Sequence, residues 1–229
     1  MQATGRKARA GRQWGALVEA SAVFAAAMLY LWRFRLFYPS SFLVVLGYVI
    51  GSRFSHGETA ADVGLGWRNA RKAFPPVLAC AAAIAAVILA AGAAFGTQRN
   101  VTAGRALAGT AAYIVWGLFQ QYLLNGYFLN RFVEFSGDPA GRLAPAAAAA
   151  VFAAVHLPNW FLMAVTFAGG YVAARVFLKY RSLYPVAAAH GIIGYALLVS
   201  VPDSVAAGFI VGPRYLLKVY GTYPEFLLF

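Results

Sequence analysis

Acidic side chains are scarce in this chain of 229 residues, which has seven Asp and Glu against nineteen Lys and Arg. Charged residues of either sign make up only 11% of the chain, whereas 62% of its residues are hydrophobic. A soluble domain of this length needs a more polar surface, so lipid is the solvent that fits this composition. The lack of charge therefore excludes an ordinary soluble domain and indicates an integral membrane protein.

Cysteine occurs only once, at Cys80 in an alanine-rich apolar run, so an internal disulfide is excluded. The net charge of +12 would suggest nucleic acid as the partner of a soluble protein. Here the basic residues fall between apolar stretches, and membrane topology and anionic lipid headgroups explain them better. We therefore expect membrane lipids, and no nucleic acid, among the partners.

Long apolar stretches divide the chain into seven expected transmembrane helices, because about 20 apolar residues cross a bilayer. The spans are expected at residues 14–32, 42–51, 75–95, 106–128, 143–156, 161–178 and 183–201. The tail at 203–229 is apolar but interrupted by Gly and Pro, and it is either a short eighth helix or a half-buried segment. The sequence thus predicts an all-α, polytopic bundle of about seven or eight transmembrane helices.

The basic residues also predict how the chain is oriented. Residues 1–13 carry four basic residues and no acid, which is typical of a solvated cytoplasmic tail ahead of a transmembrane domain at 14–229. Three further inner segments are expected: a polar surface segment at 52–72, a hydrophilic linker at 130–142, and the basic stretch that contains Arg175, Lys179 and Arg181. With seven spans, thirteen basic residues then lie inside and six outside. We expect a cytoplasmic amino terminus in a bacterial inner (plasma) membrane.

Three groups of polar side chains lie within or at the ends of the expected spans, where each polar group is costly. The first is Gln120, Gln121 and Asn125, of which Gln121 and Asn125 share a helix face at i and i+4. The second is His156, at the end of the fifth span, and the third is His190, deep in the seventh. Buried polar groups cluster at functional sites, so we favour one shared site for all three groups.

Each of these residues also has a purely structural interpretation. The glutamines either form interhelical hydrogen bonds, worth about 0.6–2 kcal/mol per contact, or line a neutral cavity that binds a headgroup or peptide. Taken singly, His156 is a helix-end imidazole bonded to a backbone carbonyl, and His190 is a packed neutral core histidine. A metal held by His156 and His190 is less favoured, because no carboxylate or thiolate ligand is evident nearby. No cofactor is otherwise expected.

The order and spacing of these groups resemble the CPBP family of CAAX proteases and bacteriocin-processing proteins. That family carries Glu-Glu-x-x-x-Arg, Phe-x-x-x-His and His-x-x-x-Asn on separate transmembrane helices. This chain has Gln120-Gln121-x-x-x-Asn125, Phe152-x-x-x-His156 and His190-x-x-x-Gly194. Residues 126–128, 157–159, 181–185 and 62–66 are also similar to family segments. The resemblance is best over 106–201 and loose in the amino-terminal half.

The resemblance implies an intramembrane endopeptidase that acts on prenylated or membrane-anchored peptides. In the family, the first glutamate and the second-motif histidine are held to activate a water molecule. Gln120 occupies the position of that glutamate here, and His156 is its partner. Gln121 stands at the second glutamate and Asn125 at the arginine. Gln120, Gln121, Asn125 and His156 are therefore candidate catalytic positions. At the three of them where the family has a charged residue, this chain has an amide.

The same resemblance assigns the oxyanion site to the third motif. His190 is present, whereas Gly194 replaces the asparagine and has no side chain to donate. Phe152, Asn159 and Gly194 are expected to contribute to the binding of the substrate. The site that the resemblance implies therefore keeps its two imidazoles but lacks one of the hydrogen-bond donors to the oxyanion.

The replacements leave two functions open. A tuned carboxylate accepts a proton from water near neutral pH, whereas a neutral amide does not. The chain is then either a divergent endopeptidase or a pseudo-protease that binds a lipid- or isoprenoid-like ligand or scaffolds a membrane partner. Glu19, in the first expected span, either lies near the cytoplasmic interface or replaces the lost base. His56 is interpreted as a solvated residue of the polar surface segment.

Overall fold

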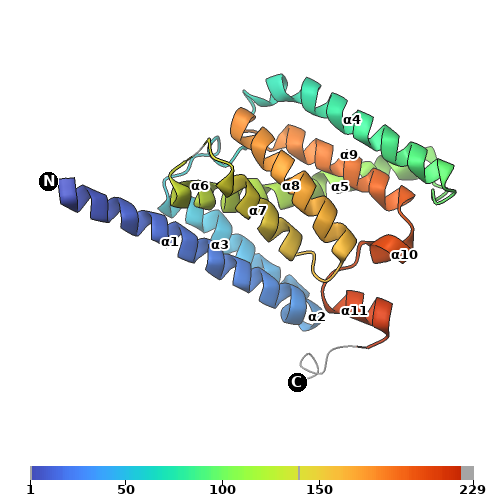
Figure 1. Ribbon diagram of the computed structural model, residues 1–229, viewed down its shortest axis with the longest axis horizontal. Coiled ribbons are helices and arrows are strands. Elements are labelled where there is room, and N and C mark those ends of the chain that lie inside the picture. The colour runs from blue at the N-terminus through green and yellow to red at the C-terminus, as the bar shows by residue number, and fades with distance from the viewer. Residues whose placement is uncertain (1, 139, 223–229) are drawn as a thin grey trace.

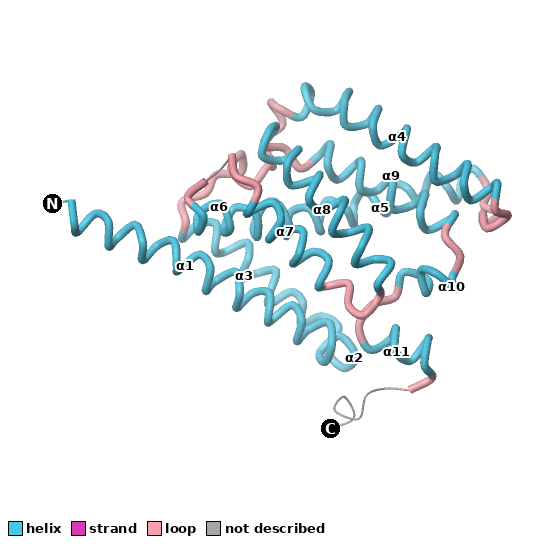
Figure 2. The backbone as a smooth tube through the Cα atoms, viewed as in Figure 1, coloured by secondary structure: helices cyan, strands magenta, loops and turns pink. Residues whose placement is uncertain are grey.

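The structure is a computed structural model that describes residues 2–138 and 140–222, with side chains described from Ala10 onward. Within these residues the chain forms helices joined by short loops, and no strand occurs (Figures 1 and 2). The predicted all-α fold is therefore confirmed.

The chain begins with a long helical hairpin and continues with shorter and longer helices in turn. The hairpin consists of α1 (Gln2–Leu29), η1 (Tyr30–Phe34), α2 (Arg35–Phe37), η2 (Pro39–Ser41) and α3 (Phe42–Ser55). It is followed by α4 (Ala70–Ala94), α5 (Ala103–Gln121), η3 (Tyr122–Leu129), α6 (Asn130–Ser136), α7 (Leu143–Ala154), α8 (Trp160–Tyr180) and α9 (Tyr184–Ser200). The described part ends with α10 (Asp203–Ala206), η4 (Ala207–Phe209) and α11 (Pro213–Tyr220).

The helices form one bundle in which α1 and α3 lie at one side and α4 and α9 at the other (Figure 1). Helices α7 and α8 lie between these two sides and pack against each other (Figure 1). Helix α9 packs against both α4 and α5, and α1 packs against α6. The segments expected to carry the first and third polar groups, on α5 and α9, are thus neighbours.

Glycines allow α5 and α9 to approach closely. A Cβ atom at Gly191 would lie 2.6 Å from the backbone nitrogen of Ile114, a distance that no side chain tolerates. A Cβ at Gly117 would lie 3.0 Å from the carbonyl oxygen of Ala187. Small residues of this kind are the usual means of close helix contact in membranes. They fix the distance between α5 and α9 at the site described below.

Two segments expected outside the spans continue neighbouring helices. Helix α1 begins at Gln2, so the basic residues of the expected tail lie on the same helix as the first expected span. The helix that begins at Ala103 passes without interruption through η3 and α6 to Ser136, so half of the expected linker is helical. It ends at Gly137, whose left-handed conformation (φ 65°) suits the end of a helix. The polar residues of α6 are helical because charged partners from other segments surround them.

The expected surface segment between α3 and α4 is in part a packed element. The Leu183 amide donates to the Gly64 carbonyl at 2.9 Å, and Arg181 donates to the carbonyl of Asp62. Gly64 has a φ of +82°, and a Cβ there would lie 2.9 Å from the Leu183 side chain. This loop therefore holds the α8–α9 turn in place, although the Asp62 side chain remains exposed.

Among the described residues, three helices are long and apolar enough to cross a membrane: Ala10–Phe37, Ala70–Ala94 and Trp160–Tyr180. A fourth span results if α9 and the segment Asp203–Phe209, which meet at 116°, count as one bent element. The count of seven or eight spans stays a prediction. Of the tail, the described residues form three short helices, and 223–229 lie outside the described residues.

Candidate functional site

Gln121 and Asn125 lie on one face of the helix where α5 passes into η3. Both side chains are buried, with exposed fractions of 1% and 0%. The Asn125 amide donates to Gln121 Oε1 at 2.5 Å, as their i and i+4 spacing predicts. The carbonyl of the Gln121 side chain is thus occupied, and its NH₂ group points to another helix.

That other helix is α9, where His190 faces Gln121. Gln121 Nε2 lies 3.4 Å from His190 Nδ1, so the amide donates and the ring nitrogen accepts. The imidazole fits beside α5 because Gly117 has no side chain; a Cβ there would lie 3.0 Å from His190 Cδ2. The accepting Nδ1 places the proton of a neutral ring on Nε2.

His156 follows the end of α7 and joins the same group through Phe152. Its Nδ1 lies 2.6 Å from the Phe152 carbonyl, which only accepts, so this ring nitrogen donates. The Phe152 ring centroid is 5.1 Å from that of His156 and 6.1 Å from that of His190. We call Gln121, Asn125, His156 and His190 the amide–imidazole cluster.

Besides Phe152, which contacts both imidazoles, three residues predicted for the site are not part of this cluster. Gln120 is half-buried, and its side chain forms no hydrogen bond within the described residues. It points about 100° away from Gln121, because the two residues are adjacent on a helix. Asn159 is 1% exposed and caps α8 through Leu162, while its NH₂ group donates to the carbonyls of Ala206 and Ile210. These contacts give Asn159 a role in the fold.

Gly194 packs against α5. A Cβ at this position would lie 3.1 Å from Cδ1 of Tyr113. The tyrosine therefore occupies the space that a longer side chain at position 194 would need. Its predicted role in substrate binding stays a prediction.

The amide–imidazole cluster offers neutral hydrogen-bonding groups. Its own hydrogen bonds run among amides, imidazoles and backbone, and no carboxylate takes part in them. Asn125 Oδ1 is buried without a hydrogen-bond partner in the described part of the chain, so one acceptor is unsatisfied. No group of three or more His, Cys, Asp or Glu among the described residues is placed to hold a metal ion. This chemistry suits recognition of a neutral polar group.

A second polar cluster, which the sequence analysis did not predict, surrounds Arg131 on α6. Its guanidinium is 1% exposed and forms two hydrogen bonds with Glu58, at 3.1 and 3.0 Å. It also donates to Ser52 Oγ at 3.1 Å, and it lies 3.6 Å from a Glu19 oxygen and 3.8 Å from a Glu134 oxygen. Burial alone would lower the pKa of Arg131, but these acids, Glu58 first, hold it above its usual value.

His56 completes this second cluster, and its interpretation as a solvated residue is wrong. Its Nε2 lies 2.7 Å from a Glu19 oxygen and its Nδ1 lies 3.1 Å from a Glu134 oxygen. Tyr127 donates to Glu19 at 3.1 Å, and Ser52 Oγ donates to Glu19 as well. Glu19 is thus engaged here, and neither imidazole of the amide–imidazole cluster is among its partners. We call Glu19, Ser52, His56, Glu58, Arg131 and Glu134 the acid–arginine cluster.

Residue spacing gave a partial signal for the acid–arginine cluster. Ser52 and His56 share a helix face at i and i+4, and Arg131 and Glu134 share one at i and i+3. In a membrane protein with seven acids, each acid near an apolar stretch needs a partner. Those facts predict pairing but not which helices supply the partners.

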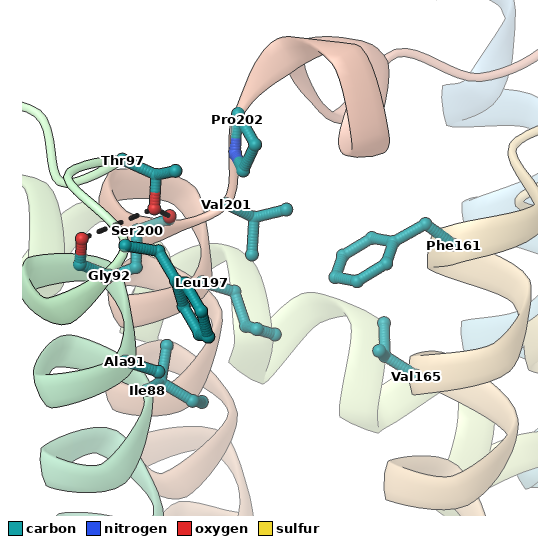
Figure 3. Close-up of a pocket in the computed structure, with 11 residues that line it drawn as sticks. Ile88, Ala91, Gly92, Thr97, Phe161, Val165, Leu197, Ser200, Val201 and Pro202 are labelled. Atoms are coloured by element: carbon teal, nitrogen blue, oxygen red, sulfur yellow. Dashed lines mark hydrogen bonds between the residues drawn. The ribbon is translucent and has the colours of Figure 1, made fainter.

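An apolar pocket of about 430 Å³ lies elsewhere, between α4, α8 and α9 (Figure 3). Phe161 and Val165 approach it from α8, opposite Leu197 on α9 (Figure 3). No residue of either polar cluster lines it. It is therefore separate from the amide–imidazole cluster.

Residues 102–196 match the family model described as Rce1-like, "Type II CAAX prenyl endopeptidase Rce1-like". The match covers α5 to most of α9 and thus every residue of the amide–imidazole cluster. No curated protein and no solved structure matches the chain. The predicted resemblance is confirmed over these residues, and together with the apolar helices it indicates an integral membrane protein with a protease-like fold.

Proposed function

We propose that this Rce1-like membrane protein binds prenylated or membrane-anchored peptides at the amide–imidazole cluster and does not hydrolyse them. The observation that carries the proposal is the hydrogen bonding of Gln121, whose partners are Asn125 and His190. A base that activates water needs a group that takes up a proton, and neither amide does so. Binding without cleavage is the function that these side chains support best.

The neutral character of the cluster also favours a peptide over an ionic ligand. A buried amide or imidazole pairs well with a backbone N–H or C=O, and the free Asn125 Oδ1 accepts a donor of that kind. A carboxylate or phosphate would enter a buried site with no cation in it, at a large cost in desolvation. The lipid anchor of the peptide would remain in the bilayer beside the helices.

A second candidate is a divergent endopeptidase, which the family match over residues 102–196 favours. His156 would then accept the proton of the attacking water without help from a carboxylate. Its Nδ1 donates to the Phe152 carbonyl, so Nε2 of the neutral ring is the nitrogen that can accept a proton. Nε2 has no hydrogen-bond partner within the described residues. His190 would stabilise the oxyanion alone.

Peptide binding and cleavage separate the two candidates. The purified protein is offered prenylated and transmembrane peptides, and the wild type is compared with Gln120→Glu, His156→Ala and the remote control Cys80→Ser. We expect the wild type and the control to bind without cleavage. Cleavage by the wild type that disappears in His156→Ala would overturn the proposal in favour of the endopeptidase. Cleavage that appears only in Gln120→Glu would identify a protease site that has lost its base.

We also propose that the amino terminus is cytoplasmic and that the membrane is a bacterial inner membrane. The support is the excess of basic residues in the segments that would then lie inside. This orientation puts Arg131 and its acids at the cytoplasmic end of the bundle. Labelling of single cysteines in intact cells tests it, with Cys80→Ser as the background and one cysteine placed at Gly137 or Gly96. A reagent that cannot cross the membrane should reach position 96 and not 137.

A further inference from the structure

The apolar pocket lies between α4, α8 and α9. Phe161 and Val165 on α8 face Leu197 and Val201 across this space (Figure 3). Ile88 and Ala91 of α4 line it beside Leu197. Its volume of about 430 Å³ lies within the range of roughly 300–1,000 Å³ that is typical of small-molecule sites.

The lining of the pocket is suited to hydrocarbon. Nearly all lining residues are apolar, and the exceptions with a hydroxyl are Thr97 and Ser200. The Thr97 hydroxyl donates to the Ser200 carbonyl at 2.7 Å and is thus already engaged (Figure 3). Two of the three helices, α4 and α8, are long and apolar enough to cross a membrane. With these helices in a bilayer, an acyl chain can enter the pocket from the lipid without crossing water.

Two cations share one carboxylate beside the pocket, and we call Arg99, Asp203 and Lys218 its rim. Asp203 directly follows Pro202, which lines the pocket, and it pairs with both Arg99 and Lys218. Lys218 donates to Asp203 at 2.9 Å, and Arg99 bonds to the other carboxylate oxygen. The rim therefore keeps one net positive charge, and the Arg99 and Lys218 side chains are 43% and 37% exposed. A phosphate is the natural partner of exposed Arg and Lys side chains held side by side.

We propose that this pocket holds one acyl chain of an anionic glycerophospholipid, whose phosphate contacts Arg99 and Lys218. The apolar walls select the chain, and the net charge of the rim selects the anionic headgroup. The site shares no residue with the amide–imidazole cluster, so it goes beyond the peptide binding proposed above. It gives the protein a resident lipid at the end of α9 opposite the loop at 181–183.

Retention of lipid by the purified full-length protein tests the proposal. The protein is exchanged into detergent with equal amounts of phosphatidylglycerol and phosphatidylcholine, and bound lipid is counted by native mass spectrometry. We expect one retained phosphatidylglycerol at least fivefold in excess over phosphatidylcholine. Leu197→Trp and Val165→Trp, which fill the pocket from opposite walls, should each reduce its retention at least fivefold. Val87→Trp, at an exposed position on α4 outside the pocket, is the matched control and should change nothing.

The same experiment tests the two cations of the rim with a double variant. The double variant Arg99→Gln with Lys218→Gln should still retain lipid but lose the preference for phosphatidylglycerol. Unchanged retention in both tryptophan variants would overturn the proposal, and so would an equal loss in Val87→Trp, which would identify surface lipid only. Thermal unfolding confirms that each variant is folded. If one tryptophan variant does not fold, the other and the rim variant decide the outcome.

Discussion

Replacement of Arg131 by methionine tests how much the acid–arginine cluster contributes to stability. Methionine keeps an apolar stem of similar length but removes the guanidinium that Glu19, Glu58 and Glu134 face. With a guanidinium that is 1% exposed, water cannot take its place without a rearrangement of the bundle. Loss of one partner of a buried ion pair costs about 3–5 kcal/mol, and we expect a loss in this range.

Glu58 contributes most of that loss, because it forms two hydrogen bonds with Arg131 and is itself 14% exposed. Glu134 contributes least, since it is farther away and more exposed, so solvent screens its charge. For a chain of this size each kcal/mol shifts the unfolding midpoint by roughly 2–4 °C, so the expected fall is roughly 6–20 °C. Thermal unfolding in detergent micelles, followed by circular dichroism, measures it.

Matched variants separate the missing charge from the altered packing. Arg131→Lys keeps the charge but loses the planar fork that binds both Glu58 oxygens, and it should lie between the wild type and Arg131→Met. Arg131→Met combined with Glu58→Gln should recover at least ~1 kcal/mol, because one uncompensated charge is removed. Arg12→Met, on the exposed part of α1, should stay within about 0.5 kcal/mol of the wild type. A loss below ~1 kcal/mol for Arg131→Met would refute the reasoning.

Three further changes test other parts of the fold. Gly191→Ala should cost about 1–3 kcal/mol in unfolding free energy, because its Cβ would lie 2.6 Å from a backbone nitrogen of α5, whereas Gly169→Ala, with nothing within 4 Å, should cost nothing. Asn159→Ala should lower the unfolding free energy by about 1–3 kcal/mol, since it removes the α8 cap and leaves two carbonyls near α10 unpaired. Hydrogen bonds from Thr59 hold the pKa of Asp62 below its usual value. The stabilising contribution of the Asp62 carboxylate is therefore present above the unfolded pKa of about 3.9, and it is lost as the pH falls through the lower folded pKa. Asp62→Asn should therefore show a smaller fall in unfolding midpoint between pH 5 and pH 3 than the wild type does; an equal fall would contradict this assignment.

Hydrophobicity and local spacing predicted much of the architecture. The apolar stretches located the main helices, because a helix in lipid must be apolar over most of its length. The i and i+4 spacing of Gln121 and Asn125 predicted their hydrogen bond, since helix geometry is local. The contact between Gln121 and His190 was inferred from family order and not from spacing, because no local rule relates α5 to α9.

The errors arose where tertiary contacts override local composition. Residues 130–136 are polar and were expected in a linker, yet they are helical because Arg131 is buried among acids from α1 and the α3–α4 loop. His56 was likewise expected in solvent because it lies in a polar segment, yet Glu19 and Glu134 flank its ring. The structural role of Asn159, which joins α8 to the carboxy-terminal helices, was missed as well, while its predicted contact with substrate stays a prediction. In each case the partner lies more than 35 residues away or on another helix.

The distribution of charge between the two polar clusters has a physical consequence for the site. Glu19, Glu58 and Glu134 all face Arg131, so these three carboxylates have a compensating charge. The amide–imidazole cluster contains no cation, and a carboxylate there would be buried without compensation. A glutamate at position 121 or an arginine at position 125 would be destabilising without the other, whereas Gln121 and Asn125 are both neutral and share one hydrogen bond. The neutral side chains of this site therefore avoid a buried, uncompensated charge, which is consistent with the binding role proposed above.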